Sequence, residues 1–367
     1  MIIHNFPPGP VGGAELQAER LTTHLVKLGH TIQVLTWLTV PDAPCEETYA
    51  GVQIHRVPHH LPYWITHDNA DTFRYLVRQR KTYDVLHAHM MFGHAVVAVV
   101  AARCLGKKCI VKIACAGEYG DLDTFSKFTG FDKALRILYQ ADTIVAVSRE
   151  VQQELLRYGF PPERIVRIPN GVDTIFFQRS QPFPEPGKTR FILMGRRHPQ
   201  KGIDTTLLAA RQLQEQGLGD QFEIYLYGAE YPEYAYRAMA RELGVDSIVS
   251  FCDFEKDILA VYHAAHCFLL PSRGEGLSNS LLEAMALELP VIATPVSGTP
   301  DVVDDGKDGI FIPPDSPDAL ASAMQKIIAS PALARMLGEN ARRKVTSLFS
   351  LDHVAQRYSE LYDRLCS

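Results

Sequence analysis

Short runs of β-branched and aliphatic residues alternate along the chain with segments whose apolar residues recur every three or four positions. In the first half these runs predict strands at 31–36, 52–57, 84–89, 109–114, 143–147 and 164–168. Helical spacing is clearest at 13–28, and Gly29 follows it as a stop signal. Alternating strands and helices predict a parallel sheet covered on both faces.

The alternation breaks at 173–189, where three prolines, a glycine and the loss of periodicity indicate a linker. It resumes with predicted strands at 190–195, 222–228, 247–251, 266–270, 290–294 and 309–312. The predicted fold class is α/β, with two doubly wound parallel-sheet, Rossmann-like domains facing a cleft. We expect domains at 1–175 and 187–349, with a last helix, 350–367, packing back on the first domain.

Length and composition restrict the number of domains, the partners and the compartment that are expected. At 367 residues the chain is longer than the roughly 250–300 at which one core stops growing. A net charge of −5 argues against nucleic acid as a partner, and seven cysteines without a Cys-x-x-Cys pair fit a reduced compartment. The longest apolar run, 95–102, is short of the about 20 residues that span a bilayer, and the first residues do not form a secretory signal. We therefore expect a cytoplasmic protein.

Three nucleotide-binding or hydrolytic signatures are absent from the sequence. No Gly-x-Gly-x-x-Gly opens a helix, the 304–309 segment lacks the full pattern of a P-loop, and no Gly-x-Ser-x-Gly elbow occurs. The absence of these motifs argues against a dehydrogenase, a P-loop kinase or an α/β-hydrolase.

A basic loop, 194–202, follows the first predicted strand of the second half and carries Arg196 and Lys201. Ligands bind at the carboxyl ends of such strands, and a diphosphate requires paired positive donors. The alternative is a solvated basic loop without a ligand. The position at the end of the strand favours diphosphate binding.

The segment RGEGLSNSLLEAM places Glu275 between Gly274 and Gly276, with Glu283 on the helix that follows. The glycines allow backbone amides to face an anion at the start of that helix; these are the amides of Gly276, Leu277, Ser278 and Asn279. Glu275 can accept hydrogen bonds from sugar hydroxyls, and Glu283 from a ribose diol. Together with Arg196 and Lys201 they describe a site for a nucleoside diphosphate-sugar.

Gly12 and Gly13 join the first short strand to the first helix. Paired glycines let a ligand approach the backbone closely. They also occur at ordinary loop–helix joins.

Five segments resemble the retaining glycosyltransferases of family 4, which have the GT-B fold, and the resemblance covers nearly the whole chain. They are GGAE, ADTIVAVS, IPNGVD, GRRHPQKG and PSRGEGLSNSLLEAMALELPVIATPVSGTPDVV. The most specific part is the pair of glutamates, Glu275 and Glu283, separated by seven residues.

The resemblance implies that Arg196 and Lys201 hold the donor diphosphate, that Glu283 holds the ribose, and that Gly12 and Gly13 approach the phosphates. Glu275 and the amides after it would face the donor sugar and β-phosphate. Arg196, Lys201 and Glu275 are the implied catalytic set. The resemblance implies neither a metal nor an enzyme nucleophile. No cofactor is expected, because the nucleoside diphosphate-sugar is a substrate, for which UDP is the favoured nucleotide. The leaving phosphate would assist a hydroxyl acceptor, which is a glycan, a lipid-linked molecule or a small molecule.

The sequence departs from the family pattern after the strand at 109–114. Many members have a histidine where this chain has Ala114, Cys115 and Ala116, followed by Glu118 and Asp121. Either acid could substitute for the histidine, and neither is favoured. The segments 227–233 and 251–257 also lack the family's usual glycines, so the base preference stays open.

Several alternatives remain. Asp121 and Asp123 match the Asp-x-Asp of metal-dependent glycosyltransferases, and His87 and His89 fit an acceptor contact as well as packing. The basic stretch 73–81 fits a solvated helix better than a peripheral membrane contact at the inner face. Two rival functions are a sugar-nucleotide-binding subunit without activity and a sugar-nucleotide epimerase.

Overall fold

The computed structural model describes residues 1–7, 12–40, 42–58, 64–184, 187–253 and 255–367. The chain divides into two compact units. Unit 1 comprises Met1–Gly171 and Leu351–Ser367, and unit 2 comprises Val172–Ser350. The start of the predicted linker belongs to unit 2, because Arg342 donates hydrogen bonds to the carbonyls of Thr174 and Phe177. Positions 185 and 186 of that linker lie outside the described residues.

Unit 1 contains a three-stranded sheet in the order β1-β3-β2 and a four-stranded sheet in the order β4-β5-β6-β7. Ile2 forms parallel bridges to Leu35 of β1 and Ala88 of β4, so the first residues connect the two sheets. The strands are β1 Gln33–Trp37, β2 Glu46–Tyr49, β3 Val52–Val57, β4 Val85–His89, β5 Lys108–Ile113, β6 Thr143–Ala146 and β7 Ile165–Arg167.

The hydrophobic pattern missed β2, which pairs antiparallel with β3. Its residues are mostly exposed, so no apolar periodicity marks it. An antiparallel edge strand does not need a buried face on both sides. The sheet of unit 1 is therefore mixed rather than wholly parallel.

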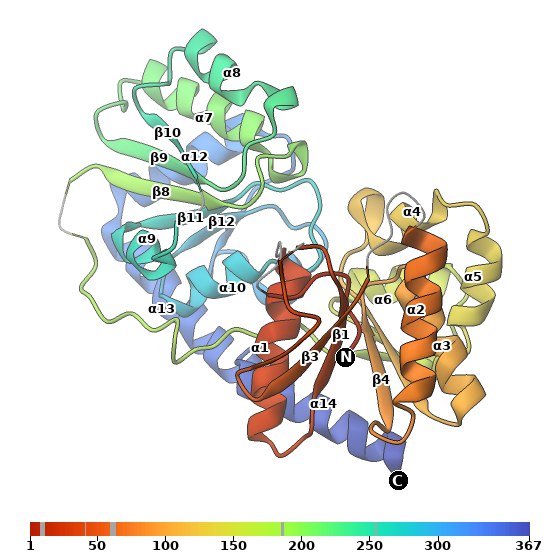
Figure 1. Cartoon of the computed structure of the whole chain (residues 1–367). Helices are drawn as coiled ribbons and strands as arrows, with labels where there is room; N and C mark the ends of the chain where they lie inside the picture. The colour runs from red at the N-terminus through yellow and green to blue at the C-terminus, as the bar shows by residue number, and fades with distance from the viewer. Residues whose placement is uncertain (8–11, 41, 59–63, 185–186, 254) are drawn as a thin grey trace. The chain divides into compact units, whose positions relative to one another are not determined.

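The helices of unit 1 cover both faces of its sheet, with α1 and α14 on one face and α2 and α3 on the other (Figure 1). Leu21 and Leu25 of α1 pack with Ile110, Tyr358 and Leu361 in one core cluster. The helices are α1 Gly13–Lys27, α2 Trp64–Arg78, α3 Gly93–Leu105, α4 Asp121–Ser126, α5 Phe131–Leu138, α6 Arg149–Arg157 and α14 Leu351–Cys366, with short 3-10 turns at Gly117–Tyr119 and Pro162–Arg164.

Unit 2 has one six-stranded parallel sheet in the order β10-β9-β8-β11-β12-β13. The strands are β8 Thr189–Met194, β9 Phe222–Tyr227, β10 Val249–Cys252, β11 Cys267–Leu270, β12 Val291–Ala293 and β13 Ile310–Phe311. The chain proceeds outward from β8 to β10 and then returns to the other side of β8 with β11. This reversal creates a topological switch point between β8 and β11, where doubly wound sheets bind ligands.

Helices α7, α8 and α12 cover one face of this sheet, and α9 and α10 cover the other (Figure 1). The helices and turns are η3 Pro199–Lys201, α7 Ile203–Glu215, η4 Pro232–Tyr234, α8 Tyr236–Glu242, α9 Ile258–Ala264, α10 Asn279–Ala286, α11 Thr299–Val302, α12 Pro317–Ala329 and α13 Pro331–Leu348. All the strands that the sequence predicted in this unit are present.

Within the described ranges, no helix is long and apolar enough to cross a membrane. The basic stretch 73–81 forms the end of α2 and the residues after it. Arg74 is exposed there and pairs with Asp71 at 2.7 Å, as expected for a solvated helix. A peripheral membrane contact stays a prediction.

Candidate functional site

Two loops meet at the switch point of unit 2, one after β8 and one after β11. Lys201, at the end of the first loop, donates a hydrogen bond from Nζ to Oε1 of Glu275 in the second, at 2.5 Å. Their side chains are only 14% and 8% exposed. The structure therefore joins two of the residues that the sequence selected, although 74 positions separate them.

Glycines permit this close approach. Gly202 has a φ of +64°, and a Cβ at this position would lie 2.1 Å from the carbonyl oxygen of Pro271. At Gly195 a Cβ would lie 2.9 Å from Cε of Lys201. Side chains at these positions would separate the loops, so the backbone freedom of glycine is needed here.

Glu275 is fixed by further hydrogen bonds besides the one from Lys201. Its Oε1 accepts a bond from the Ser272 hydroxyl at 2.7 Å, and its amide donates to Oγ of Ser297 at 3.0 Å. Ser297 has a φ of +53°, which is unusual for a residue with a side chain. The next loop thus supports the backbone that carries Glu275.

The two adjacent arginines after β8 have different surroundings. Arg196 is exposed, and across the described residues its side chain has no acidic ion-pair partner within 4.0 Å. Arg197 is 1% exposed and pairs with Glu230 at 2.9 Å. It also donates to the carbonyl of Cys252. Arg197 therefore links the ends of β8, β9 and β10. The sequence alone does not reveal this role, because the partners of Arg197 lie on other loops.

Glu283 lies on α10 and is 7% exposed. Its Oε2 accepts a hydrogen bond from the hydroxyl of Tyr262 at 2.9 Å. Ser278 caps α10 by accepting a bond from the amide of Leu281 at 3.3 Å, and Asn279 is the first residue of the helix. Gly276 accepts a bond from the amide of Gly298 at 2.8 Å, and Leu277 is buried.

Gly12 and Gly13 begin α1 in unit 1; Pro10 and Val11 of the same motif lie outside the described residues. The amide of Gly12 donates to Oε2 of Glu15 at 2.9 Å. A phosphate at this amide would have to displace the Glu15 carboxylate. A role for the two glycines in phosphate binding stays a prediction.

His87 and His89 lie in the layer between the sheet of unit 1 and α14, 2% and 1% exposed. Their rings stack at 4.3 Å, and Nδ1 of His87 is 2.8 Å from the Tyr362 hydroxyl. Burial lowers the pKa of both well below the ordinary value, so both are neutral. These surroundings favour packing over acceptor contact.

Lys112 lies beside these histidines, paired with His89 across β4 and β5. Its Nζ donates to Oδ1 of Asn170 at 3.0 Å, and burial lowers its pKa to about 8. The sequence alone does not predict a role for this lysine, because a single lysine in an apolar strand is not a motif.

The acids near the missing histidine have separate partners. The Asp121 carboxylate accepts bonds from the amides of Ala114 at 3.1 Å and Met91 at 3.2 Å. Asp123 pairs with Lys127 at 2.8 Å, and Glu118 is exposed. Asp121 therefore fastens the loops after β4 and β5 to each other, and Cys115, in the loop after β5, is half-buried. These contacts do not support a shared metal site for Asp121 and Asp123.

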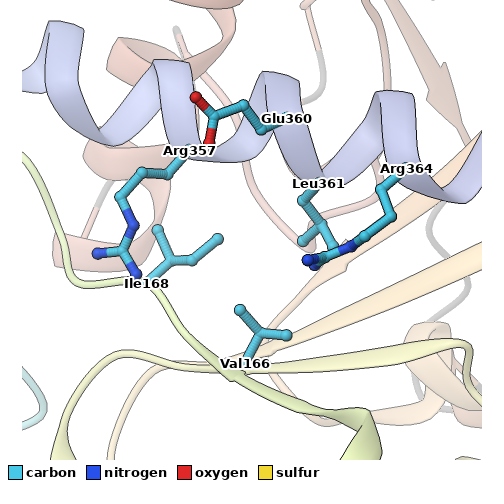
Figure 2. Close-up of a pocket in the computed structure, with 6 residues that line it drawn as sticks. All are labelled: Val166, Ile168, Arg357, Glu360, Leu361 and Arg364. Atoms are coloured by element: carbon cyan, nitrogen blue, oxygen red, sulfur yellow. The ribbon is translucent and has the colours of Figure 1, made fainter.

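A hollow of about 150 Å³ lies in unit 1 between β7 and α14 (Figure 2). Arg357, Glu360, Leu361 and Arg364 of α14 line one wall of the hollow. Arg357 donates to the carbonyl of Arg167 at 2.5 Å, on the strand that ends the sheet. This hydrogen bond covers a carbonyl at the edge of the sheet. It explains the position of Arg357 in the hollow without a bound ligand.

Two family models match successive parts of the chain. Residues 11–176 match the model described as glycosyltransferase family 4, and residues 175–344 match the model described as glycosyl transferases group 1. Together the matches include every residue of the candidate site. An uncharacterized glycosyltransferase of Methanocaldococcus jannaschii is 24% identical over 99% of this chain and 97% of its own length.

Solved structures agree with the fold. Sucrose-phosphate synthase from Thermosynechococcus elongatus has a TM-score of 0.78 at 22% identity, covering 97% of this chain and 94% of that one. Anabaena HepE, solved in complex with UDP and glucose, has a TM-score of 0.80 at 18% identity, covering 99% and 98%. These similarities, with the two α/β units, confirm the predicted fold class and GT-B architecture.

Proposed function

The chain belongs to the group 1, or family 4, glycosyltransferases, and we propose that it transfers a sugar from a nucleoside diphosphate-sugar to a hydroxyl acceptor with retention of configuration. The observation that carries this proposal is the Lys201–Glu275 pair at the switch point of unit 2. It places a cation for phosphate and a carboxylate for hydroxyls in direct contact, and the exposed Arg196 belongs to the same loop as Lys201.

In this proposal Arg196 and Lys201 bind the diphosphate. Phosphate oxygens attract the ammonium of Lys201 and draw it from Glu275, whose carboxylate then accepts hydrogen bonds from the sugar. The amides of Gly276, Leu277, Ser278 and Asn279 add positive potential at the start of α10. Glu283 binds the ribose, and Tyr262 holds its carboxylate in place.

The proposed reaction depends on the charges that develop as the sugar leaves the diphosphate. As the bond to the leaving phosphate breaks, the sugar gains positive charge and the diphosphate gains negative charge. Glu275 stabilises the first change, and Arg196 with Lys201 stabilises the second. The leaving phosphate takes the proton of the attacking hydroxyl on the same face, so configuration is retained and the reaction uses neither a metal nor an enzyme nucleophile.

The donor is open in base and sugar, and UDP-glucose is the first candidate. HepE was solved with UDP and glucose, which supports trying these ligands first. A hexose acceptor or an inositol-like polyol would both satisfy the proposal.

Calorimetric titration with UDP-, GDP- and ADP-sugars tests the proposal, followed by an assay for released nucleoside diphosphate across sugar and lipid-linked acceptors in EDTA. We expect one donor to bind and to release its nucleotide on addition of an acceptor. NMR of the product should give the anomeric configuration of the donor. Inversion would contradict the mechanism, and activity that requires Mn²⁺ or Mg²⁺ would contradict metal independence.

The same assay separates the rivals. Binding without release by any acceptor would indicate a subunit that binds the nucleotide-sugar without transfer. Conversion of the donor without an acceptor would indicate an epimerase. The loop with Ala114 in place of a histidine motivates keeping both in the test.

A further inference from the structure

We propose that Arg273 is a positioning residue of the donor site, which fixes Lys201 and Glu275 relative to each other without contacting the donor. The inference rests on the proposed function, because it concerns the same site. Arg273 lies two positions before Glu275, in the loop after β11.

Hydrogen bonds to backbone carbonyls join this loop to the one that carries Lys201. The amide of Arg273 donates to the carbonyl of Gln200 at 2.8 Å, and Nη1 of Arg273 donates to the carbonyl of Pro199 at 2.5 Å. In return, Nε2 of Gln200 donates to the carbonyl of Gly274 at 2.8 Å. The two loops are therefore connected immediately before Lys201 and immediately before Glu275.

Two carboxylates complete the surroundings of the guanidinium. Asp204, in the first turn of α7, accepts from Nη1 at 3.0 Å and from Nη2 at 2.7 Å. Asp315, before α12, accepts from Nε at 2.7 Å and lies 2.6 Å from Nη2. Arg273 thus connects the loop after β11 to the start of α7 and to the segment before α12.

Acceptors within the protein surround this side chain. The guanidinium donates four hydrogen bonds, to Pro199, Asp204 and Asp315, and its Nη2 also lies 2.6 Å from the Asp315 carboxylate. Four of the five N–H groups of the guanidinium are thus committed to the protein, which distinguishes Arg273 from the exposed Arg196. Its action on the donor must pass through the loops that it holds.

Positioning of this kind has large effects on a reaction. Lys201 and Glu275 both sit on irregular backbone rather than inside a long helix or strand. A displacement of about 1 Å in such groups can reduce a rate by on the order of 100-fold. Lysine cannot replace arginine here, because it lacks the planar fork that binds Asp204 at two points.

The test compares Arg273→Lys with a matched arginine in the same unit. Arg190 donates from Nε to Glu223 at 2.8 Å and is similarly half-buried, but it lies at the amino end of β8, opposite the site. Binding of UDP-glucose is measured by calorimetry for wild type, Arg273→Lys and Arg190→Lys. We expect Arg273→Lys to weaken binding by about tenfold or more, and Arg190→Lys by less than about twofold.

A double-mutant cycle with Lys201→Ala shows whether Arg273 acts through Lys201. We expect Arg273→Lys to add less than about a twofold effect in the Lys201→Ala background, because the group that it positions is gone. Asp315→Asn, which keeps the arginine, should weaken binding in the same direction but less. Should Arg273→Lys fail to fold, Asp315→Asn carries the same cycle.

Equal affinities for Arg273→Lys and Arg190→Lys would overturn the inference, as would losses that simply add to that of Lys201→Ala. If UDP-glucose is not the donor, the nucleotide-sugar that binds in the panel replaces it. Absence of binding to every nucleotide-sugar would instead overturn the proposed function, and the role of Arg273 with it.

Discussion

The two units place charged and polar residues near the carboxyl ends of parallel strands in different ways. In unit 2 the charges are paired: Lys201 with Glu275, and Arg273 with Asp204 and Asp315. In unit 1 the row of His87, His89 and Lys112 lies under α14, where Asn170 and Tyr362 are neutral partners.

This difference has an energetic meaning. A buried pair whose hydrogen bonds are satisfied can hold a geometry, whereas a buried charge without an ion-pair partner destabilises the fold. Asp121 attracts the charge of Lys112, but burial has the larger effect on its pKa. Among the described residues, Nε2 of His87 and Nε2 of His89 in this row lack hydrogen-bond partners, as does the hydroxyl of Tyr358 on α14. Unit 2 therefore resembles a site prepared for a charged ligand, and the unit 1 row resembles a polar inclusion in a core.

Lys201→Ala, in unit 2, should have the largest effect on both stability and turnover. It leaves the Glu275 carboxylate buried without its cation, which costs about 3–5 kcal/mol of unfolding free energy in buried pairs. We expect a loss near the lower end, because Ser272 still donates to the carboxylate. Donor turnover should fall about 100- to 1,000-fold.

Thermal and chemical denaturation measure the first effect, and nucleotide release measures the second. Adding Glu275→Gln to Lys201→Ala should restore part of the stability and none of the turnover. Stability unchanged in both variants would mean that the pair does not hold the loops together.

Lys112→Met, in unit 1, should instead increase the free energy of unfolding. Burial lowers the pKa of Lys112 from 10.5 to about 8, so at pH 7 the folded protein keeps a costly charge. This lowering corresponds to about 3 kcal/mol, the upper limit of the expected gain in unfolding free energy. The loss of the bond to Asn170 reduces the gain.

The pH dependence follows from the unfolded chain keeping its proton up to pH 10.5 while the folded protein loses it near pH 8. Between these values the unfolded state binds more protons, so wild-type stability rises with pH and the advantage of Lys112→Met shrinks. Urea denaturation at pH 7, 8.5 and 10 measures the difference. A constant advantage would show that Lys112 does not carry a buried charge.

Glu275→Gln and Glu283→Ala distinguish a catalytic role from a binding role within the unit 2 site. Glu275 is expected to act on a sugar that gains charge, and its replacement should lower kcat. Glu283 is expected to bind an unchanging ribose, and its replacement should raise the donor KM with kcat largely intact. Either effect should be about 10- to 150-fold, the value of one charge-assisted hydrogen bond.

Steady-state kinetics with the donor identified by titration distinguish these outcomes. A rise in KM alone for both variants would make Glu275 a binding residue without a catalytic role.

The smallest predicted effects come from two buried tyrosines. Tyr262 of unit 2 donates its hydroxyl to Glu283, whereas the Tyr358 hydroxyl of unit 1 has no partner among the described residues. Tyr262→Phe should cost about 1–3 kcal/mol, and Tyr358→Phe should change stability by less than about 0.5 kcal/mol. Denaturation of both variants in parallel gives the comparison, and equal losses would contradict it.

The sequence predicted the elements with buried, β-branched runs, because burial on both sheet faces leaves an apolar pattern. It did not predict β2, whose residues are mostly exposed and include two glutamates. It assigned Lys201 and Glu275 to one donor site, but it did not predict the direct contact between them, which depends on strand order that periodicity does not contain. Arg273 and Arg197 were missed for the same reason, since their partners lie on other loops.

The chain passes from unit 1 to unit 2 after Gly171 and returns after Ser350. Unit 2 is therefore continuous in sequence, whereas unit 1 lacks α14 until the end of the chain has been made. Tyr358, Leu361 and Tyr362 of that helix complete the core around Leu21 and Ile110. During synthesis unit 2 should reach its native state first. The hydrophobic face of unit 1 that α14 covers should stay exposed until that helix has been made.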